Sequence, residues 1–391
     1  MGISGKERSA LLLIVLLLLL VWLLTYIAPP ELEVTSPHKN NVADVWWRTN
    51  QKQKARQSSA ESKAASSGEP RRCFPASAER PCQAKCSDRI TATRQTSISH
   101  AITLVTGYYK VKSKHPVDDY MSRVENFLLR IWTPTVVFSD NATFSDVKKF
   151  RDIIAMRARL MPGRTHTVLQ DMESTPLAKE FGPVMRRQEH RDPELFRGHN
   201  YQLYLIWLLK TESLLRAVDE NLFCSEWFMW VDIGAFRSKD LKFEHWPSLD
   251  RLSMVPKSRV LMALVNPFLK GHDRNWLEKP ENMDEWLKEG ESSIDGDHIV
   301  GTYIAFNIRL KAHEHFFRGL WYTYDKLASK DHLIIKDQTV LNALYYVMPE
   351  LFAFVPCRDD AGIGNWMYLE AWLAEASERP NQEQLTSLLL P

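Results

Sequence analysis

A long uncharged apolar run near the amino terminus constrains this chain more than any other feature. The nineteen residues from Ala10 to Ala28 carry no charged side chain and are mostly leucine. As a helix, a run of this length spans the roughly 30 Å hydrocarbon core of a bilayer. A cleaved signal peptide is the alternative, but its apolar region is usually only about 7–15 residues long. We therefore predict an uncleaved signal anchor, a transmembrane helix over residues 10–28.

The charges on either side of this run predict its orientation. Lys6 and Arg8 precede it, whereas Glu31 and Glu33 follow it. Basic residues next to a membrane span stay on the cytosolic side. We expect a cytosolic tail over residues 1–9 and a single-pass, type II membrane protein whose remaining chain lies in the secretory lumen.

Composition favours a globular lumenal body behind a stem. The chain has 50 Lys and Arg against 48 Asp and Glu, and 45% of its residues are hydrophobic. A nucleic-acid interface needs an excess of basic side chains to displace counterions, so we expect no nucleic-acid partner. Residues 51–72 contain no large apolar side chain and cannot build a core. We predict a flexible stem over residues 29–97.

The five cysteines are too few for a disulfide scaffold, but a lumenal location would let them oxidise. Cys224 enters one apolar run and Cys357 leaves another, so these two form a candidate disulfide, with two buried thiols as the alternative. Cys73, Cys82 and Cys86 lie in the stem. The odd total leaves one thiol over, which makes a homodimer linked through a stem cysteine a candidate assembly.

One N-x-[ST] sequon lies in the predicted lumenal body. It is Asn141-Ala142-Thr143, within a polar stretch typical of a turn. Such an asparagine accepts N-glycans in the secretory lumen, so Asn141 is a candidate glycosylation site.

The body, residues 98–375, alternates short apolar runs with helical patterns. Short β-branched runs closed by polar residues or glycine are typical of buried strands, and the 3.6-residue apolar repeat is typical of helices. The alternation predicts an α/β fold, a mostly parallel sheet flanked by helices. Residues 376–391 are predicted to form a loose tail. We expect strands at 101–106, 135–138, 165–169, 228–231, 260–265, 299–306 and 351–355, and helices at 119–132, 144–157, 201–218, 316–327 and 338–347.

Polar residues after two of these strands are candidate ligand-binding groups, because ligands bind at the carboxyl ends of strands in such sheets. Tyr108, Tyr109 and Lys110 follow the first strand and offer rings for stacking on a base and a cation for phosphate. Asp232 ends the strand at 228–231, where a carboxylate suits a divalent cation that bridges two phosphates. Packing aromatics and a turn-capping aspartate are the alternatives without a ligand.

Two further polar groups precede later elements. Asp337 and Gln338 start the last predicted helix, where a simple helix cap is the alternative. Asp295, Asp297 and His298 precede a strand, and a solvated turn is favoured there over a metal site. A metal-dependent hydrolase built on these three residues is a third function to test. No P-loop, G-x-G-x-x-G, H-E-x-x-H or G-x-S-x-G motif occurs in the sequence.

Four motifs in order resemble the HtrL/YibB protein family. They are Thr-Leu-Val-Thr-Gly-Tyr-Tyr, a Trp207-x-x-Lys210 helix, Trp-Val-Asp-Ile-Gly-Ala-Phe-Arg and Lys-Asp-Gln-Thr-Val-Leu-Asn, within roughly residues 98–360. That family looks like a group of GT-A-type nucleotide-sugar glycosyltransferases with a Rossmann-like fold. The order of tail, anchor, stem and body is similar to that of Golgi glycosyltransferases, which implies a Golgi membrane location. Two leucines between Trp207 and Lys210 favour packing over catalysis for this helix.

The resemblance also implies roles for single residues. Asp232 matches the first acid of the D-x-D of GT-A enzymes, which holds the metal and the donor diphosphate, although Gly234 replaces the second acid. Asp337 and Gln338 resemble a D-Q pair whose acid faces the acceptor or the sugar.

These expectations converge on a lumenal glycosyltransferase-like protein. It would transfer a sugar from a nucleotide-diphosphate sugar to a glycan or protein acceptor, with Mn²⁺ or Mg²⁺ held by Asp232, with or without Asp295 or Asp297. Tyr108, Tyr109 and Lys110 would lie beside the nucleotide. Asp337 and Gln338 would be the catalytic pair, with Asp337 near the reacting sugar as a candidate base for the acceptor hydroxyl. The alternative is a non-catalytic lumenal module that keeps the fold and binds a glycan or a protein.

Overall fold

The computed structural model describes residues 101–112, 116–237, 245–266, 293–306, 316–357 and 367–374. The predicted cytosolic tail, anchor (10–28), stem (29–97) and carboxyl-terminal tail (376–391) lie outside these residues, as do the three stem cysteines. Within the described ranges, every helix is too short or too polar to cross a bilayer.

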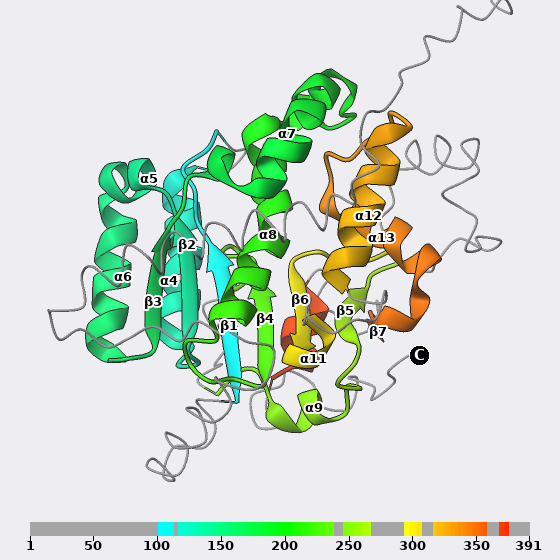
Figure 1. The fold of residues 1–391 in the computed structure, drawn as a ribbon. Coiled ribbons are helices and arrows are strands. Elements are labelled where there is room, and N and C mark those ends of the chain that lie inside the picture. The colour runs from blue at the N-terminus through cyan, green and yellow to red at the C-terminus, as the bar shows by residue number, and fades with distance from the viewer. Residues whose placement is uncertain are drawn as a thin grey trace, which may run out of the picture. The chain divides into compact units, whose positions relative to one another are not determined.

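The strands of the described ranges form one mixed sheet in the order β3-β2-β1-β4-β6-β5-β7 (Figure 1). Only β6 is reversed: it runs antiparallel to β4 and β5, while all other neighbours pair in parallel. The predicted mostly parallel α/β sheet is confirmed. The strands are β1 (Ile102–Gly107), β2 (Thr135–Ser139), β3 (Thr165–Leu169), β4 (Trp227–Val231), β5 (Val260–Leu264), β6 (His298–Thr302) and β7 (Phe352–Pro356).

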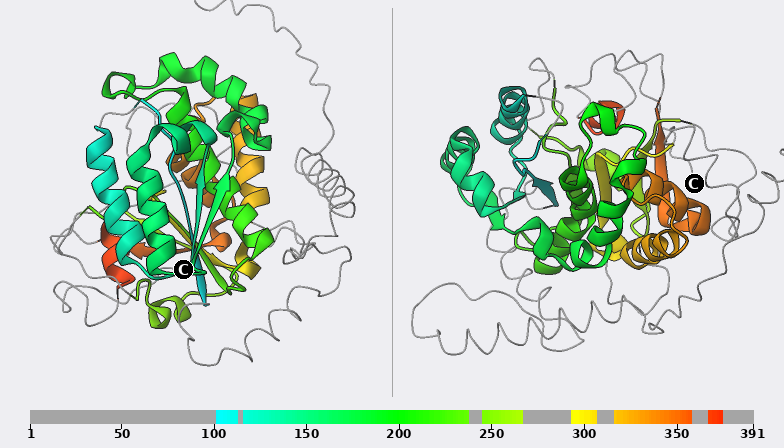
Figure 2. Two further views of the ribbon diagram at one scale, coloured as in Figure 1. Left: turned by 90° about the vertical axis from the view of Figure 1, so that its left-hand side faces the viewer. Right: turned by 90° about the horizontal axis from the view of Figure 1, so that it is seen from above.

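Helices cover both faces of this sheet (Figure 2). On one face, α4, α6 and α14 share a core with the alternate strand residues Leu104, Met229 and Leu261. On the other face, α8 packs on β1 and β4, with α7 and α13 beside it and α12 against α13. The helices are α4 (Val117–Arg130), α5 (Asn141–Asp146), α6 (Lys148–Leu160), α7 (Pro176–Gln188), α8 (Tyr201–Glu220), α9 (Leu249–Ser253), α11 (Tyr303–Phe306), α12 (Phe316–Ser329), α13 (Asp337–Val347) and α14 (Tyr368–Trp372), with short 3₁₀ turns η1 (Met172–Ser174), η2 (Glu189–Arg191), η3 (Leu195–Arg197) and η5 (Pro349–Leu351).

Local capping explains where the predicted elements differ. The strand expected at 299–306 ends at Thr302, whose hydroxyl accepts the N–H groups of Ile304 and Ala305 and starts α11. The helix expected at 144–157 is divided into α5 and α6, which meet at Val147. The sequence did not predict α7, which begins after the capping side chain of Thr175.

The predicted glycosylation residue Asn141 begins α5 and is exposed. Asp140 caps the helix by accepting the N–H of Thr143 at 2.6 Å, and the Thr143 hydroxyl accepts the N–H of Lys110 at 2.7 Å. The sequon therefore lies in a hydrogen-bonded turn at the surface, and glycosylation of Asn141 stays a prediction.

The candidate disulfide between Cys224 and Cys357 is wrong. Cys224 is in a disulfide but Cys357 is a thiol, so the partner of Cys224 lies outside the described residues. Because β4 and β7 run in the same direction, Cys224 before β4 and Cys357 after β7 lie at opposite edges of the sheet. A disulfide needs Cα atoms within about 7 Å, which this arrangement does not allow.

A fully buried arginine ties α4 and α6 to β2 and β3. Burial, with the nearby charge of Arg164, lowers the pKa of Arg157 to about 10. Its guanidinium donates to five acceptors, which replace the water that a buried cation without an acidic partner would lose. The acceptors are the carbonyls of Leu128, Ile131 and Thr133 and the hydroxyls of Thr135 and Thr165.

Replacing Arg157 by methionine should lower the free energy of unfolding by about 3–5 kcal/mol, because buried carbonyls then lose their donors. Urea denaturation of the full-length protein measures the change. Arg159→Met, at an exposed position of the same helix, should change it by less than about 0.5 kcal/mol. Equal effects of the two substitutions would contradict a structural role for Arg157.

Candidate functional site

A lysine and three aspartates meet at the carboxyl end of β4. The Lys210 Nζ lies 2.9 Å from an oxygen of Asp337, 3.3 Å from one of Asp232 and 3.7 Å from one of Asp297. It also donates to the carbonyl of Gly296 at 3.1 Å. The Lys210 side chain is 2% exposed, whereas those of Asp232 and Asp297 are 29% and 22% exposed. The cation is thus buried, and two of its carboxylates reach the surface.

The reversed strand β6 brings two of these acids together. Val231 of β4 pairs with His298 of β6, and Asp232 donates its N–H to the carbonyl of Asp297 at 2.9 Å. Opposed residues of an antiparallel ladder carry their side chains on the same face. Since β6 runs against β4, the residues before β6 lie at the same sheet edge as the residues after β4.

A pocket of ≈ 270 Å³ lies at this edge. Its walls combine the two partly exposed carboxylates with arginine, aromatic and aliphatic side chains, which is the mixture that a charged ligand with a ring would contact. It is lined by Gly107, Tyr108, Tyr109, Val111, Val117, Tyr120, Arg123, Arg197, Gly198, His199, Leu203, Ile206, Trp207, Trp230, Asp232, Ile233, Gly234, Arg237 and Asp297.

One face of α8 supplies both the pocket wall and the buried cation. Leu203, Ile206 and Trp207 line the pocket, and Lys210 follows at the spacing that keeps a residue on the same helix face. Trp207 thus lines the pocket and Lys210 pairs with acids, contacts that the expectation of packing for this pair did not include. A sequence signal existed: a lysine in an apolar helix turn is buried only where acids neutralise it.

The predicted site residues divide into two groups. Tyr108 and Tyr109 line the pocket beside Asp232. Lys110 does not, because its ammonium pairs with Asp146 at 3.1 Å on the exposed surface. Asp337 is 7% exposed and lies against Lys210, outside the pocket wall.

Gln338, the second residue of the predicted pair, also lies outside the pocket wall. Its backbone N–H donates to the Asp337 carboxylate at 2.9 Å, and its carbonyl accepts from Asn342 at 2.9 Å. The Asp337-Gln338 pair therefore starts α13 and positions the acid against Lys210.

The pKa values of the two acids at the pocket, Asp232 and Asp297, shift in opposite directions. Burial raises the pKa of Asp232 well above its ordinary value; the Lys210 ammonium opposes this and the Asp297 charge adds to it. Burial also acts to raise the pKa of Asp297, but Lys210 and a hydrogen bond with Asp232 bring it below its ordinary value. Burial disfavours the Lys210 charge, yet Asp232, Asp337 and Asp297 hold its pKa well above the ordinary value. Asp232 is therefore the acid of this pair that holds a proton more readily, and Asp297 is the one that stays ionised.

Two glycines shape this centre. A Cβ at position 234 would contact Tyr120 and Arg123, at 3.5 and 3.8 Å, so Gly234 faces these side chains. The second acid beside Asp232 comes from Asp297 instead, which the sequence offered as an optional metal ligand although its pattern favoured a solvated turn. A Cβ at position 296 would lie 2.6 Å from the Asp337 carboxylate, so any larger residue between Asp295 and Asp297 would have to displace this carboxylate.

A second set of buried charges supports the Asp297 loop from within. Asp295 accepts the N–H of Asp297 at 2.9 Å. His298 lies between Asp295 and Glu370, with N–O distances of 3.7 and 3.6 Å, and their side chains are at most 2% exposed. Burial raises the pKa of Glu370 to about 7. Two of the three residues of the hydrolase hypothesis, Asp295 and His298, are therefore closed to a substrate, and only Asp297 reaches the pocket.

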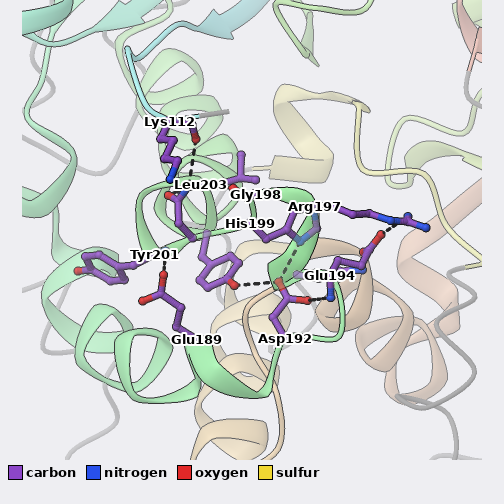
Figure 3. A network of polar contacts seen from close by, with 12 residues as sticks. Lys112, Glu189, Asp192, Glu194, Arg197, Gly198, His199, Tyr201 and Leu203 are labelled. Atoms are coloured by element: carbon purple, nitrogen blue, oxygen red, sulfur yellow. Dashed lines mark hydrogen bonds and ion pairs between the residues drawn. The ribbon is translucent and has the colours of Figure 1, made fainter. Parts of the chain in front are cut away.

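Another acid–histidine group lies on the segment before α8 (Figure 3). Asp192, Glu194 and His199 come close enough to suggest metal ligands. Their contacts are already satisfied, however: Asp192 binds His199 and the hydroxyl of Tyr204, and Glu194 pairs with Lys336 and with Arg197. An ion is not needed to explain this arrangement.

No protein-family model and no curated protein matches this chain in sequence. The arrangement of the site itself carries the functional argument. Asp232 and Asp297 are the described residues best placed to hold a divalent cation at the pocket, and the arginines are placed for an anionic ligand.

Replacing Lys210 by methionine should lower the free energy of unfolding by about 3–5 kcal/mol, measured by urea denaturation with a chelator present. The substitution removes the one ammonium among three carboxylates. Adding Asp337→Asn should recover part of the loss, because one of the facing charges is then gone. Lys179→Met, at an exposed position of α7, is the matched control; an equally small effect at Lys210 would refute the role of this cluster.

Proposed function

We propose that this chain is a GT-A-type glycosyltransferase that transfers a sugar from a nucleotide-diphosphate sugar to an acceptor hydroxyl. The observation that carries the proposal is the pair Asp232 and Asp297, partly exposed in a pocket lined by arginine and aromatic side chains. Carboxylates suit a hard divalent cation, arginines suit phosphates and aromatic rings suit a base. A metal-bound nucleotide sugar presents these three chemistries at once.

The charge of the cluster fits Mn²⁺ or Mg²⁺. Three carboxylates face one ammonium, so a divalent cation would balance the net negative charge of the ionised cluster. Asp232 and Asp297 would hold the ion, which when bound stabilises negative charge on the leaving phosphate. The indole N–H of Trp230 donates to Asp232 at 2.7 Å and, with Lys210, fixes the orientation of that carboxylate.

The pocket side chains would bind the rest of the donor. Arg123 and Arg237 come from separate segments and would contact the phosphates through charge-assisted hydrogen bonds, whereas Arg197 already pairs with Glu194. Tyr108 and Trp207 offer ring faces for the base. In this proposal Lys110 has no role at the nucleotide, since Asp146 already pairs with it.

The fold agrees with the resemblance that suggested this function. A mostly parallel sheet with the candidate site at the carboxyl ends of β1 and β4 is what a GT-A-like domain implies. The non-catalytic alternative rested partly on Gly234, and a second acid from Asp297 beside Asp232 supports the catalytic proposal instead. A type II protein of the Golgi membrane, anchored by residues 10–28, is part of the proposal.

Calorimetry on the full-length protein with UDP-, GDP- and CMP-sugars, each with and without Mn²⁺, tests the proposal. One donor should bind in a metal-dependent manner. Asp232→Asn should weaken that binding at least tenfold, because the cation loses a charged ligand.

Asp152→Asn, an exposed aspartate on α6, should leave the affinity unchanged and controls for net charge. The proposal fails if the folded wild-type protein binds none of the donors. The same result would favour the binding module for a glycan or protein partner.

A further inference from the structure

His199 lines the same pocket as Asp232 and Asp297, and a hydrogen bond to a buried carboxylate fixes its side chain there. Its Nδ1 lies 2.9 Å from an oxygen of Asp192, whose side chain is fully buried. The same oxygen accepts the hydroxyl of Tyr204 at 2.8 Å, and the other accepts the N–H of Glu194 at 2.8 Å (Figure 3). The carboxylate is therefore fixed on both sides before it meets the imidazole.

This arrangement determines which ring nitrogen is available. A carboxylate at Nδ1 favours the tautomer that carries its proton there, which leaves the lone pair on Nε2. The indole of Trp207 packs edge-on against the ring, with centroids 5.2 Å apart, and limits its rotation. The His199 side chain retains 10% exposure, so Nε2 is the nitrogen left for a molecule in the pocket.

The carboxylates near the pocket, which could also accept a proton, already have other partners. Asp232 and Asp297 form the proposed cation site with Lys210. Asp337, which the sequence suggested for this role, lies outside the pocket wall and pairs with Lys210 at 2.9 Å. Among the described residues that line the pocket, His199 is the one imidazole.

We propose that His199 is the general base of the transfer, an inference that rests on the proposed function. Its Nε2 takes the proton of the acceptor hydroxyl as that oxygen bonds to the anomeric carbon of the donor sugar. The bond from that carbon to the phosphate oxygen breaks, and its electron pair leaves with the nucleotide. One displacement without a covalent intermediate inverts the anomeric configuration. Asp192 acts through His199 as a positioning residue.

The test separates donor binding from transfer in the full-length protein. Nucleotide release is measured with the donor that binds in calorimetry, using water and a set of 4-nitrophenyl glycosides as acceptors. His199→Ala should lower the rate about 10²–10⁴-fold, while donor affinity stays within about twofold. Added imidazole should restore part of the rate, which a purely structural defect would not allow.

His190→Ala removes an exposed histidine outside the pocket and should leave both quantities unchanged. Unaltered turnover in His199→Ala, no rescue by imidazole, or a product with retained configuration would each overturn the role of His199 while the proposed function stands. A wild-type protein that binds a donor but releases no nucleotide would overturn it too and favour the binding module. A wild-type protein that binds no donor would overturn both proposals.

Discussion

The ion contacts of Lys210 join the parts of this protein that meet at the pocket. The ammonium is supplied by α8, and its acidic partners stand at the end of β4, at the start of β6 and at the start of α13. Removing such a charge from water costs several kcal/mol unless ion pairs replace the lost hydration. Lys210 can therefore be buried without a large loss of stability only when all of these segments are folded together. The packing of α8 and α13 on the sheet and the formation of the site thus depend on each other.

One reversed strand makes this convergence feasible. In a wholly parallel sheet, residues that precede a strand lie at the edge opposite to residues that follow one. Because β6 is reversed, the loop before it reaches the edge where β1 and β4 end. The buried Asp295, His298 and Glu370 contact one another beneath this loop, and Asp295 accepts the backbone N–H of Asp297. These contacts fix the backbone that carries Asp297.

Local patterns predicted most of the elements and the part of the site that follows strands directly. Asp232 and Tyr108 could be placed because an apolar run stops just before each of them. The sequence offered both Asp295 and Asp297 as partners of Asp232 and could not choose between them, because the choice depends on the direction and register of β6. It could not place Lys210, because that depends on which face of α8 meets the sheet. The Cys224–Cys357 pairing failed for another reason: a parallel sheet, which the sequence predicted, already separates a residue before one strand from a residue after another.

The small space at Gly296 has an evolutionary consequence. The Asp337 carboxylate occupies the volume that a side chain at position 296 would need, and the Gly296 carbonyl accepts from Lys210. Drift at one of these positions is therefore constrained by the other, although 40 residues separate them in the chain. Among diverged sequences of this fold, glycine at the first position and aspartate at the second should be inherited as a unit, a covariation that would identify relatives whose overall similarity has faded.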